Sequence, residues 1–155
     1  MPIDVIDADF DNPAHADAIV TLIDAYARDP MGGGASLPAA VRRDLVAGLR
    51  AHPTTVVALA FDGREPVGIA VGFVGFSTFA ARPLLNIHDL AVRPAYRGRG
   101  VGRGLLAHVE AVARARGCRK LTLEVRDDNE RAQRLYRAVG FGNEDAPMRF
   151  WTKRL

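Results

Sequence analysis

The sequence predicts a single domain, over residues 1–155, of the α/β (α+β) class. Three observations support this fold class. Apolar, β-branched runs alternate along the chain with segments of helical periodicity. Two of these runs, 54–61 and 67–76, flank an Asp62-Gly63 pair, which is a strong signal for an antiparallel hairpin. A later run leads through a short loop into an amphipathic helix and then into another strand, which makes a strand–helix–strand unit.

Before the hairpin, the pattern predicts one strand and two helices. Residues 3–8 alternate weakly, as a half-buried strand does, and residues 14–28 carry an apolar helical face. The segment 30–36 contains a proline and three consecutive glycines, which end the first helix. Pro38 fits the first turn of a second helix that runs to about residue 50.

After the hairpin, strands and helices alternate. The predicted order is a strand at 87–92, a helix at 101–116, a strand at 121–125, a helix at 130–139 and a last strand at 148–153. Asn129 is well placed as the N-cap of the last helix, and Gly140-Phe141 matches a helix-ending glycine with its hydrophobic contact.

The loop between the strand at 87–92 and the helix at 101–116 is the most informative part of the chain. Glycines stand at positions 98, 100, 102 and 104. Glycines at a helix entrance let backbone N–H groups approach a ligand, and the helix N-terminus adds partial positive charge. Arg97, Arg99 and Arg103 add full charges. These features predict a pyrophosphate-binding site; a solvated, arginine-rich turn is the plainer alternative.

Two sequence blocks resemble the GNAT acetyltransferases. Arg97-x-x-Gly100-x-Gly102 matches the family signature (Gln/Arg)-x-x-Gly-x-(Gly/Ala). The second block begins with the strand at 121–125 and continues with Asn129, Ala132, Leu135, Tyr136, Ala138, Gly140 and Phe141 at the family's spacing. Together the blocks cover about residues 86–142, and the first 85 residues match in outline only. Asp89, the apolar triplet after it and the Arg-Gly-x-Gly run are most similar to the spermidine/spermine acetyltransferase branch.

The resemblance implies both the detailed fold and the acetyl donor. GNAT proteins have a mixed central sheet flanked by helices, and its middle strands, the fourth and fifth, splay apart to admit the pantetheine arm of acetyl-CoA. For this chain it implies an N-acetyltransferase that moves acetyl from acetyl-CoA to a primary amine by direct attack in a ternary complex. The residues it assigns to the cofactor are Leu90, Ala91, Val92, Arg97, Gly98, Arg99, Gly100, Val101, Gly102, Arg103 and Asn129.

Tyr136 and His88 are the predicted catalytic residues. Periodicity alone places Tyr136 on an apolar stripe as a core tyrosine, whereas the resemblance implies a phenol that protonates the departing thiolate. His88 stands where many GNAT proteins have a glutamate near the acceptor amine, and imidazole suits a base at neutral pH. A structural histidine, with Asp89 or water as the base, is the open alternative. An ideal strand turns Asp89 to the other face, unless a bulge changes the alternation.

The predicted acceptor-binding residues are Tyr26, Asp29, Met31 and Asp89. In GNAT proteins the first two helices often shape the acceptor pocket, so the glycine-rich segment 30–36 is a candidate closing loop; a flexible connector is the alternative. The acceptor itself stays open. Small amine metabolites, polyamines, antibiotics and protein amines all fit, and a small, polyamine-like amine is favoured.

Charge is distributed unevenly along the chain, whose net charge is +3. Residues 1–92 carry 6 basic and 11 acidic side chains, and residues 93–155 carry 15 and 7. A basic half is compatible with nucleic-acid binding, but the sequence shows neither a recognition-helix motif nor interleaved aromatic residues. The phosphates of CoA explain the basic half more simply. The acidic half either attracts a cationic amine or is solvated surface.

Two other functions are open. Gly102-x-Gly104-x-x-Ala107, with Glu124 further on, formally fits a dinucleotide fingerprint. Against this, the segment 94–98 separates the glycines from their strand, and too few residues follow for the remaining strand–helix units. A CoA-binding regulatory module without catalysis is the main alternative to an enzyme.

Composition predicts the surroundings of the protein. No apolar run approaches the ~20 residues of a membrane span, and the N-terminus lacks the pattern of a signal peptide. The single cysteine, Cys118, suits a reducing compartment and is expected to fill a small buried space. We therefore expect a cytoplasmic protein with no membrane partner and no metal, and a homodimer from family habit alone.

Overall fold

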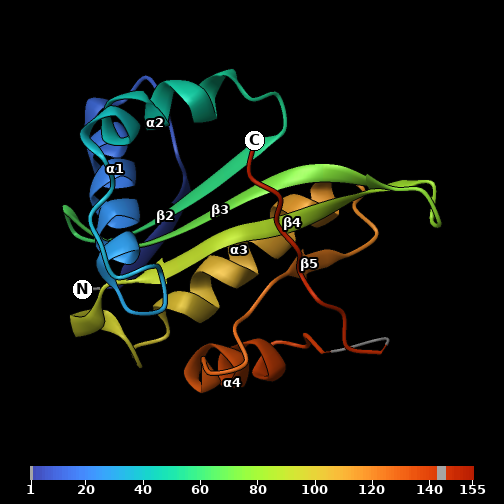
Figure 1. The fold of residues 1–155 in the computed structure, drawn as a ribbon. Helices are drawn as coiled ribbons and strands as arrows, with labels where there is room; N and C mark the ends of the chain where they lie inside the picture. Colours follow the sequence, from blue (N-terminus) through green and yellow to red (C-terminus); the bar gives the residue numbers. More distant parts are fainter. Residues whose placement is uncertain (1, 143–145) are drawn as a thin grey trace.

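A computed structural model describes residues 2–142 and 146–155. A five-stranded sheet with the order β1-β2-β3-β4-β5 forms its centre (Figure 1). The first four strands pair antiparallel with their neighbours, and β5 is parallel to β4, so the expected mixed sheet is confirmed. The strands are β1 Ile3–Asp7, β2 Thr55–Asp62, β3 Glu65–Ser77, β4 Arg82–Val92 and β5 Leu121–Leu123.

Helices lie against both faces of this sheet. They are α1 Pro13–Arg28, α2 Ala39–Ala51, α3 Val101–Ala115 and α4 Glu130–Ala138, with a short 3-10 turn at Pro94–Tyr96. Side-chain caps fix two of the helix starts, because Asn12 accepts a hydrogen bond from the amide of Ala14 and Asn129 accepts one from the amide of Ala132. The cap predicted at Asn129 is therefore confirmed.

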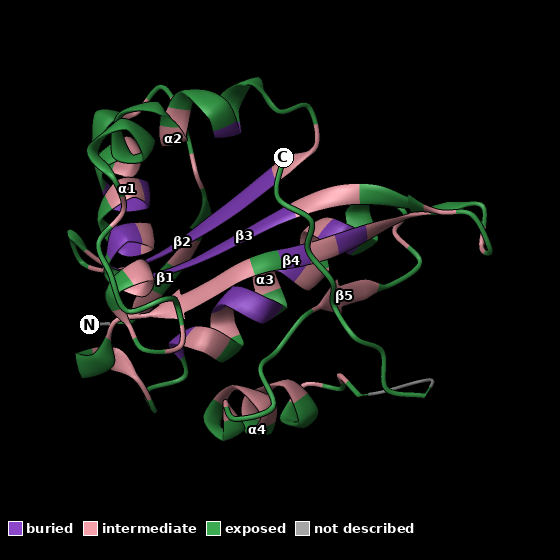
Figure 2. Cartoon of the chain, in the orientation of Figure 1, coloured by how far each residue is buried: buried purple, intermediate pink, exposed green. Residues whose placement is uncertain are grey.

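Each face of the sheet has its own hydrophobic core (Figure 2). On one face Ile19 and Leu22 of α1 pack with Leu59 and Ile69 of the sheet. On the other face α3 packs against alternate residues of the same strands, led by Leu105. Because strand side chains alternate between faces, the continuous apolar runs of β2 and β3 feed both cores at once.

The end of β4 separates from β5, which opens the sheet. Pairing between the two strands ends at Ile87 and Leu123, whereas β4 continues to Val92 along β3. The β3–β4 register also shifts here: Val71 pairs with Asp89 and Gly72 with Ile87, so His88 is an extra, bulged residue. The splay expected between the fourth and fifth strands is confirmed, and the bulge changes the side-chain alternation at its base.

Two element predictions differ markedly from the structure, and the strand predicted at 121–125 ends two residues earlier, at Leu123. The strand predicted at 148–153 is wrong, since residues 146–155 run without regular structure and are exposed. A strand needs a neighbour to bond its backbone, and alternating side chains alone do not supply one. The strand predicted at 87–92 begins earlier, at Arg82, because residues 82–86 pair with the far arm of β3. Within the described residues, no helix is both long and apolar enough to cross a bilayer.

Candidate active site

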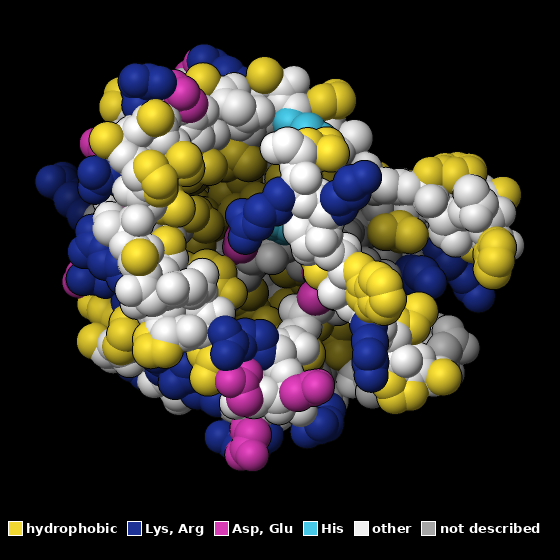
Figure 3. Space-filling model, in the orientation of Figure 1, with side chains coloured by type: hydrophobic (Ala, Val, Ile, Leu, Met, Phe, Trp, Pro, Cys, Tyr) yellow, Lys and Arg dark blue, Asp and Glu magenta, His cyan; other side chains and the backbone are white. Residues whose placement is uncertain are grey.

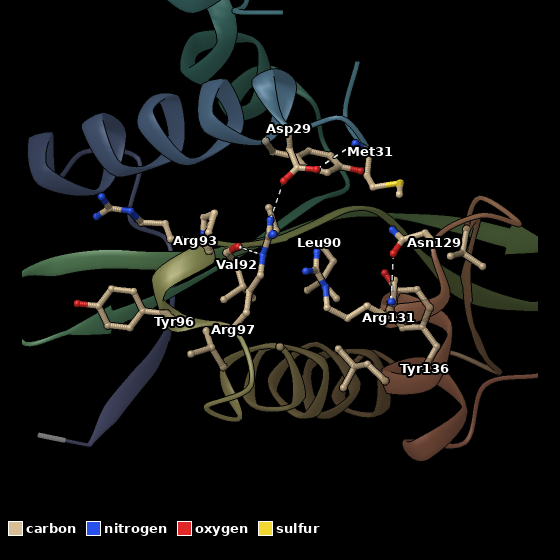
Figure 4. Close-up of a pocket in the computed structure, with 18 of the residues that line it drawn as sticks. Asp29, Met31, Leu90, Val92, Arg93, Tyr96, Arg97, Asn129, Arg131 and Tyr136 are labelled. Carbon is tan, nitrogen blue, oxygen red and sulfur yellow. Dashed lines mark hydrogen bonds and ion pairs between the residues drawn. The ribbon is translucent and has the colours of Figure 1, made fainter. Parts of the chain in front are cut away.

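A cleft of about 720 Å³ occupies the gap between the splayed strands. Its walls come from the C-terminal end of α1, the end of β4, the N-terminus of α3 and the start of α4 (Figure 4). The face of the molecule drawn in Figure 3 is hollowed near its middle, with hydrophobic side chains in the hollow and basic side chains nearby. The described ranges contain no group of three His, Cys, Asp or Glu residues that could hold a metal ion.

Backbone amides at the entrance of α3 face one end of this cleft. Within the described chain, no amide from residue 98 to residue 103 donates to another protein group. Gly98 and Gly100 have φ angles of 73° and 84°, which other residues rarely adopt, and Gly100 is the N-cap of α3. Free amides and the positive end of the helix dipole together make a site for a phosphate group.

Gly102 has a different role from the other loop glycines. A Cβ atom at this position would lie 2.8 Å from Cδ2 of Leu135 in α4. The glycine therefore lets α3 and α4 pack closely beside the cleft. The sequence pattern alone assigns all these glycines to ligand approach, but helix packing accounts for this one.

The three loop arginines point to different partners. Arg97 donates from Nε to the carbonyl of Val92 (3.1 Å) and from Nη2 to Oδ2 of Asp29 (2.8 Å). Arg99 is not among the cleft-lining residues and stacks on the ring of Tyr96, 4.8 Å from its centroid. Arg103 lines the cleft. Of the three, Arg103 is thus the arginine best placed for a phosphate inside the cleft.

Glu65 holds the turn that leads into this loop. Its carboxylate forms an ion pair with Arg93 and accepts a hydrogen bond of 2.8 Å from the hydroxyl of Tyr96. The same contact raises the pKa of Tyr96. The turn is thereby tied to the start of β3.

The free edge of β4 offers backbone groups to the cleft. The amide of Arg93 donates to Val67 on the β3 side, whereas the carbonyl of Val92 accepts from Arg97 on the opposite side. Backbone groups alternate along a strand, so those of Leu90 face the cleft like those of Val92, and those of Ala91 face β3. The N–H of Leu90 is therefore free for a ligand carbonyl.

Tyr136 projects from α4 into the same cleft (Figure 4). Burial, with a smaller contribution from Tyr26, raises the pKa of Tyr136 to about 12. Its ring packs edge-on against Phe141, with 5.8 Å between the ring centroids. The phenol is consequently a proton donor at neutral pH, next to an apolar wall that includes Leu135.

The bulge gives His88 and Asp89 separate surroundings. His88 is exposed, lines the cleft and packs edge-on against Phe73, with 5.8 Å between ring centroids. Asp89 is half-buried and is not among the cleft-lining residues. Burial raises the pKa of Asp89, and the nearby His88 opposes that shift. The bulge therefore presents the imidazole, rather than the carboxylate, to the cleft.

The segment after α1 is anchored at both ends. The carboxylate of Asp24 accepts hydrogen bonds of 2.8 Å from the hydroxyl of Ser36 and from the amide of Leu37. Asp29 accepts from the amide of Met31 at 3.0 Å, and its carbonyl accepts from the glycine amides of residues 32–34. These hydrogen bonds hold the loop in one conformation beside Tyr26, and the amides of its glycines take part in them.

Most predicted site residues meet in this cleft. The cleft contains every predicted catalytic, cofactor and acceptor residue except Arg99 and Asp89. Sequence reasoning missed Glu124, Arg126 and Arg131, which also line it. The signal that could have found them is their proximity in the sequence to the cap residue Asn129, which lines the same cleft.

Cys118 lies away from the cleft-lining residues and packs half-buried against the core on the α3 face. Burial raises the pKa of its thiol. A raised thiol pKa disfavours the reactive thiolate, which agrees with the predicted filling role.

Comparisons with known proteins agree with this geometry. The model of the acetyltransferase (GNAT) family matches residues 19–141. The N-alpha-acetyltransferase RimI of Mycobacterium tuberculosis is 41% identical over 83 residues, which are 52% of this chain and 51% of that protein. The thialysine N-epsilon-acetyltransferase of Bos taurus is 39% identical over 74 residues, or 48% of this chain and 43% of that protein. The match thus spans about half the length of these relatives.

Solved structures show the same fold. An aminoglycoside acetyltransferase, meta-AAC0020 from an uncultured soil metagenomic sample, superposes with a TM-score of 0.82 in its complex with sisomicin. The superposition covers 99% of this chain and 97% of that one, at 17% sequence identity. At this identity the similarity establishes the arrangement of elements alone.

Proposed function

The chain belongs to the acetyltransferase (GNAT) family, and we propose that this enzyme transfers the acetyl group of acetyl-CoA to a primary amine by direct attack in a ternary complex. One observation carries the assignment of the donor. A row of free amides at the start of α3 continues into the free edge of β4. The free amides at the start of α3 match the pyrophosphate of acetyl-CoA. The free edge of β4 matches the pantetheine arm, which contains amide groups.

The proposed reaction uses three groups of the cleft. An aliphatic amine with a pKa near ~10.4 is neutral only about once in a thousand molecules at neutral pH, so a base must remove its proton. We assign that step to His88, directly or through water. The amine nitrogen then attacks the thioester carbonyl, and the N–H of Leu90 stabilises the oxyanion. The C–S bond breaks, Tyr136 gives its proton to the thiolate, and the attacking nitrogen loses its second proton, which returns to the phenolate through water.

The acceptor is proposed at the level of a primary amine. The relatives' names specify different amines: an N-alpha amine, the N-epsilon amine of thialysine and an aminoglycoside. Their common chemistry is acyl transfer to an amino group, and Tyr26 and Met31 of this chain border the space where that group enters. A non-catalytic CoA-binding module is not favoured, because the chain has a proton donor and a candidate base in one cleft. The single domain over 1–155, the homodimer and the cytoplasmic location stay predictions.

Thermal unfolding tests the donor. Acetyl-CoA, CoA and NADH are added in separate samples; a ligand at about 100 times its Kd stabilises the fold by roughly 2.7 kcal/mol, a rise of several degrees in Tm. We expect a rise with both CoA species and none with NADH. Arg103→Ala should reduce the rise, and Arg114→Ala, which removes an exposed arginine paired with Glu110 on the same helix, should not. No rise with either CoA species would refute the proposal.

A further inference from the structure

The acceptor side of the cleft has little negative charge left to bind an ammonium group. The carboxylates that line it are those of Asp29 and Glu124. Asp89 lies outside the lining, but its charge, after burial, raises the pKa of Tyr26. Asp29 already accepts from the guanidinium of Arg97 at 2.8 Å and from the amide of Met31 at 3.0 Å. Glu124 accepts a hydrogen bond of 3.5 Å from the side-chain amide of Asn86 and is otherwise open to a cation. Glu124 is thus the carboxylate of the described cleft lining that is open to an ammonium group.

Positive charge, in contrast, is in excess at this side. Arg126 and Arg131 both line the cleft. Arg126 is held by a two-pronged ion pair with Asp128, at 2.9 and 2.8 Å. Arg131 forms no ion pair with any residue that the structure describes. Its neighbour Glu130 pairs instead with Arg134, at 3.9 Å on the same helix. The guanidinium of Arg131 is therefore available for an external anion.

The position of Arg131 relates it to the acceptor loop. Its side chain extends from the first turn of α4 into the cleft (Figure 4). The charge of Arg131 also contributes, after Arg97 and the amide of Met31, to lowering the pKa of Asp29 at the end of α1. Arg131 therefore lines the same cleft as Tyr26 and Met31, which border the acceptor space in the proposed reaction.

We propose that the acceptor is a primary amine that also carries a carboxylate, and that Arg131 binds this carboxylate. The inference rests on the acetyl transfer proposed above. A guanidinium presents paired N–H donors that match the two oxygens of a carboxylate. A diamine would instead place its second ammonium group near Arg126 and Arg131. The polyamine-like acceptor favoured by the acidic half of the sequence is therefore replaced by an amino acid or a related ω-amino acid.

Three amines with the same number of carbons test the acceptor class: δ-aminovalerate, pentylamine and cadaverine. They differ only in a terminal carboxylate, methyl or ammonium group. With acetyl-CoA at saturation, kcat/KM for δ-aminovalerate should exceed that for the other two by about tenfold or more, the size of a charged hydrogen bond. An equal or higher value for pentylamine or cadaverine would overturn the inference.

Variants of α4 test the assignment to Arg131. Arg131→Ala should lower the ratio of kcat/KM for δ-aminovalerate to kcat/KM for pentylamine by about 10- to 100-fold. Arg131→Lys should retain part of the wild-type kcat/KM for δ-aminovalerate, because lysine keeps the positive charge but lacks the paired N–H donors of a guanidinium. Arg134→Ala, on the same helix outside the cleft, is the matched control and should behave as wild type.

Two outcomes separate this inference from the function on which it depends. If Arg131→Ala raises the KM for acetyl-CoA equally with both acceptors, Arg131 binds the donor and the inference is wrong. If acetyl-CoA raises Tm but no carboxylated amine is acetylated, the inference fails while donor binding stands. If acetyl-CoA leaves Tm unchanged, the proposed function itself fails.

Discussion

At the scale of single residues, Tyr136 is the group whose chemistry is most strongly set by its surroundings. Its pKa of about 12 keeps the phenol protonated throughout the range in which enzymes are assayed. Tyr136→Phe should lower kcat by about 100-fold, the usual contribution of a general acid, with the KM for acetyl-CoA unchanged. Steady-state kinetics with unfolding curves for both proteins check this. The wild type should also lose no activity through this group below about pH 10; an unchanged kcat in the variant would exclude Tyr136 from the mechanism.

His88 makes a prediction about the base of the proposed reaction. His88→Ala should lower kcat/KM by about 100-fold, the usual contribution of a general base, with the KM for acetyl-CoA unchanged. The matched control is His52→Ala: His52 also packs on Phe73, at 4.9 Å between centroids, but does not line the cleft. Steady-state kinetics of both variants check this, and an unchanged kcat/KM in His88→Ala would identify another base.

At the scale of elements, the contact between α3 and the sheet depends on Gly68. A Cβ atom there would lie 2.9 Å from Val101, 3.0 Å from Leu105 and 3.2 Å from the carbonyl of Ala91. Gly68→Ala should therefore lower the free energy of unfolding by about 1–3 kcal/mol through overpacking. Because Gly68 pairs with Val92, the strain should also raise the KM for acetyl-CoA.

The control for this change is Gly48→Ala. Gly48 lies inside α2, and a Cβ atom added there would have no other atom within 4 Å, so the substitution should stabilise the protein by up to about 1 kcal/mol through helix propensity. Urea unfolding of both variants measures the two effects. Equal stabilisation of both variants would show that α3 can move away from the sheet without cost.

Helix α3 also shows which features of the structure the sequence can and cannot predict. The start of α3 was predictable because each of its determinants is local: a preceding strand, glycines with positive φ, and a helix dipole. The cap at Asn129 was predictable for the same reason. The cleft position of Arg131 was not, since it depends on how α4 packs against α3 through Gly102 and Leu135. The strand expected at 148–153 failed because strand formation depends on a partner that periodicity does not reveal.

At the scale of the whole molecule, the Asp29–Arg97 ion pair joins the two parts of the cleft for which we propose acceptor binding and phosphate binding. Asp29 ends the helix of the acceptor side, and Arg97 begins the phosphate loop, 68 residues further along the chain. The side chains are 16% and 28% exposed, so solvent screens this pair less than the surface pairs of the protein. The contact thus ties the C-terminal end of α1 to the loop that precedes α3.

The pair makes a prediction about stability and pH. The hydrogen bond from Arg97, followed by that from the amide of Met31, lowers the pKa of Asp29 below its usual value of 3.8. A carboxylate with a lowered pKa in the folded state stabilises the fold above its unfolded pKa, and that stabilisation is lost as pH falls through the folded pKa. Asp29→Asn keeps an acceptor for Met31 but removes the charge. It should cost about 1 kcal/mol at pH 7, and the difference from wild type should shrink as pH falls below 3.8 and the carboxylate is protonated.

Urea unfolding of both proteins at several pH values measures this difference. Asp44→Asn is the matched control, because Asp44 also has a lowered pKa beside Arg43, but both side chains of that pair are largely exposed. The control should unfold at the same urea concentration as wild type at every pH, since exposed pairs contribute little. If Asp29→Asn is as stable as wild type at pH 7, the pair does not hold the two sides together. If instead its deficit persists in acid, the lost stability comes from packing and not from the carboxylate charge.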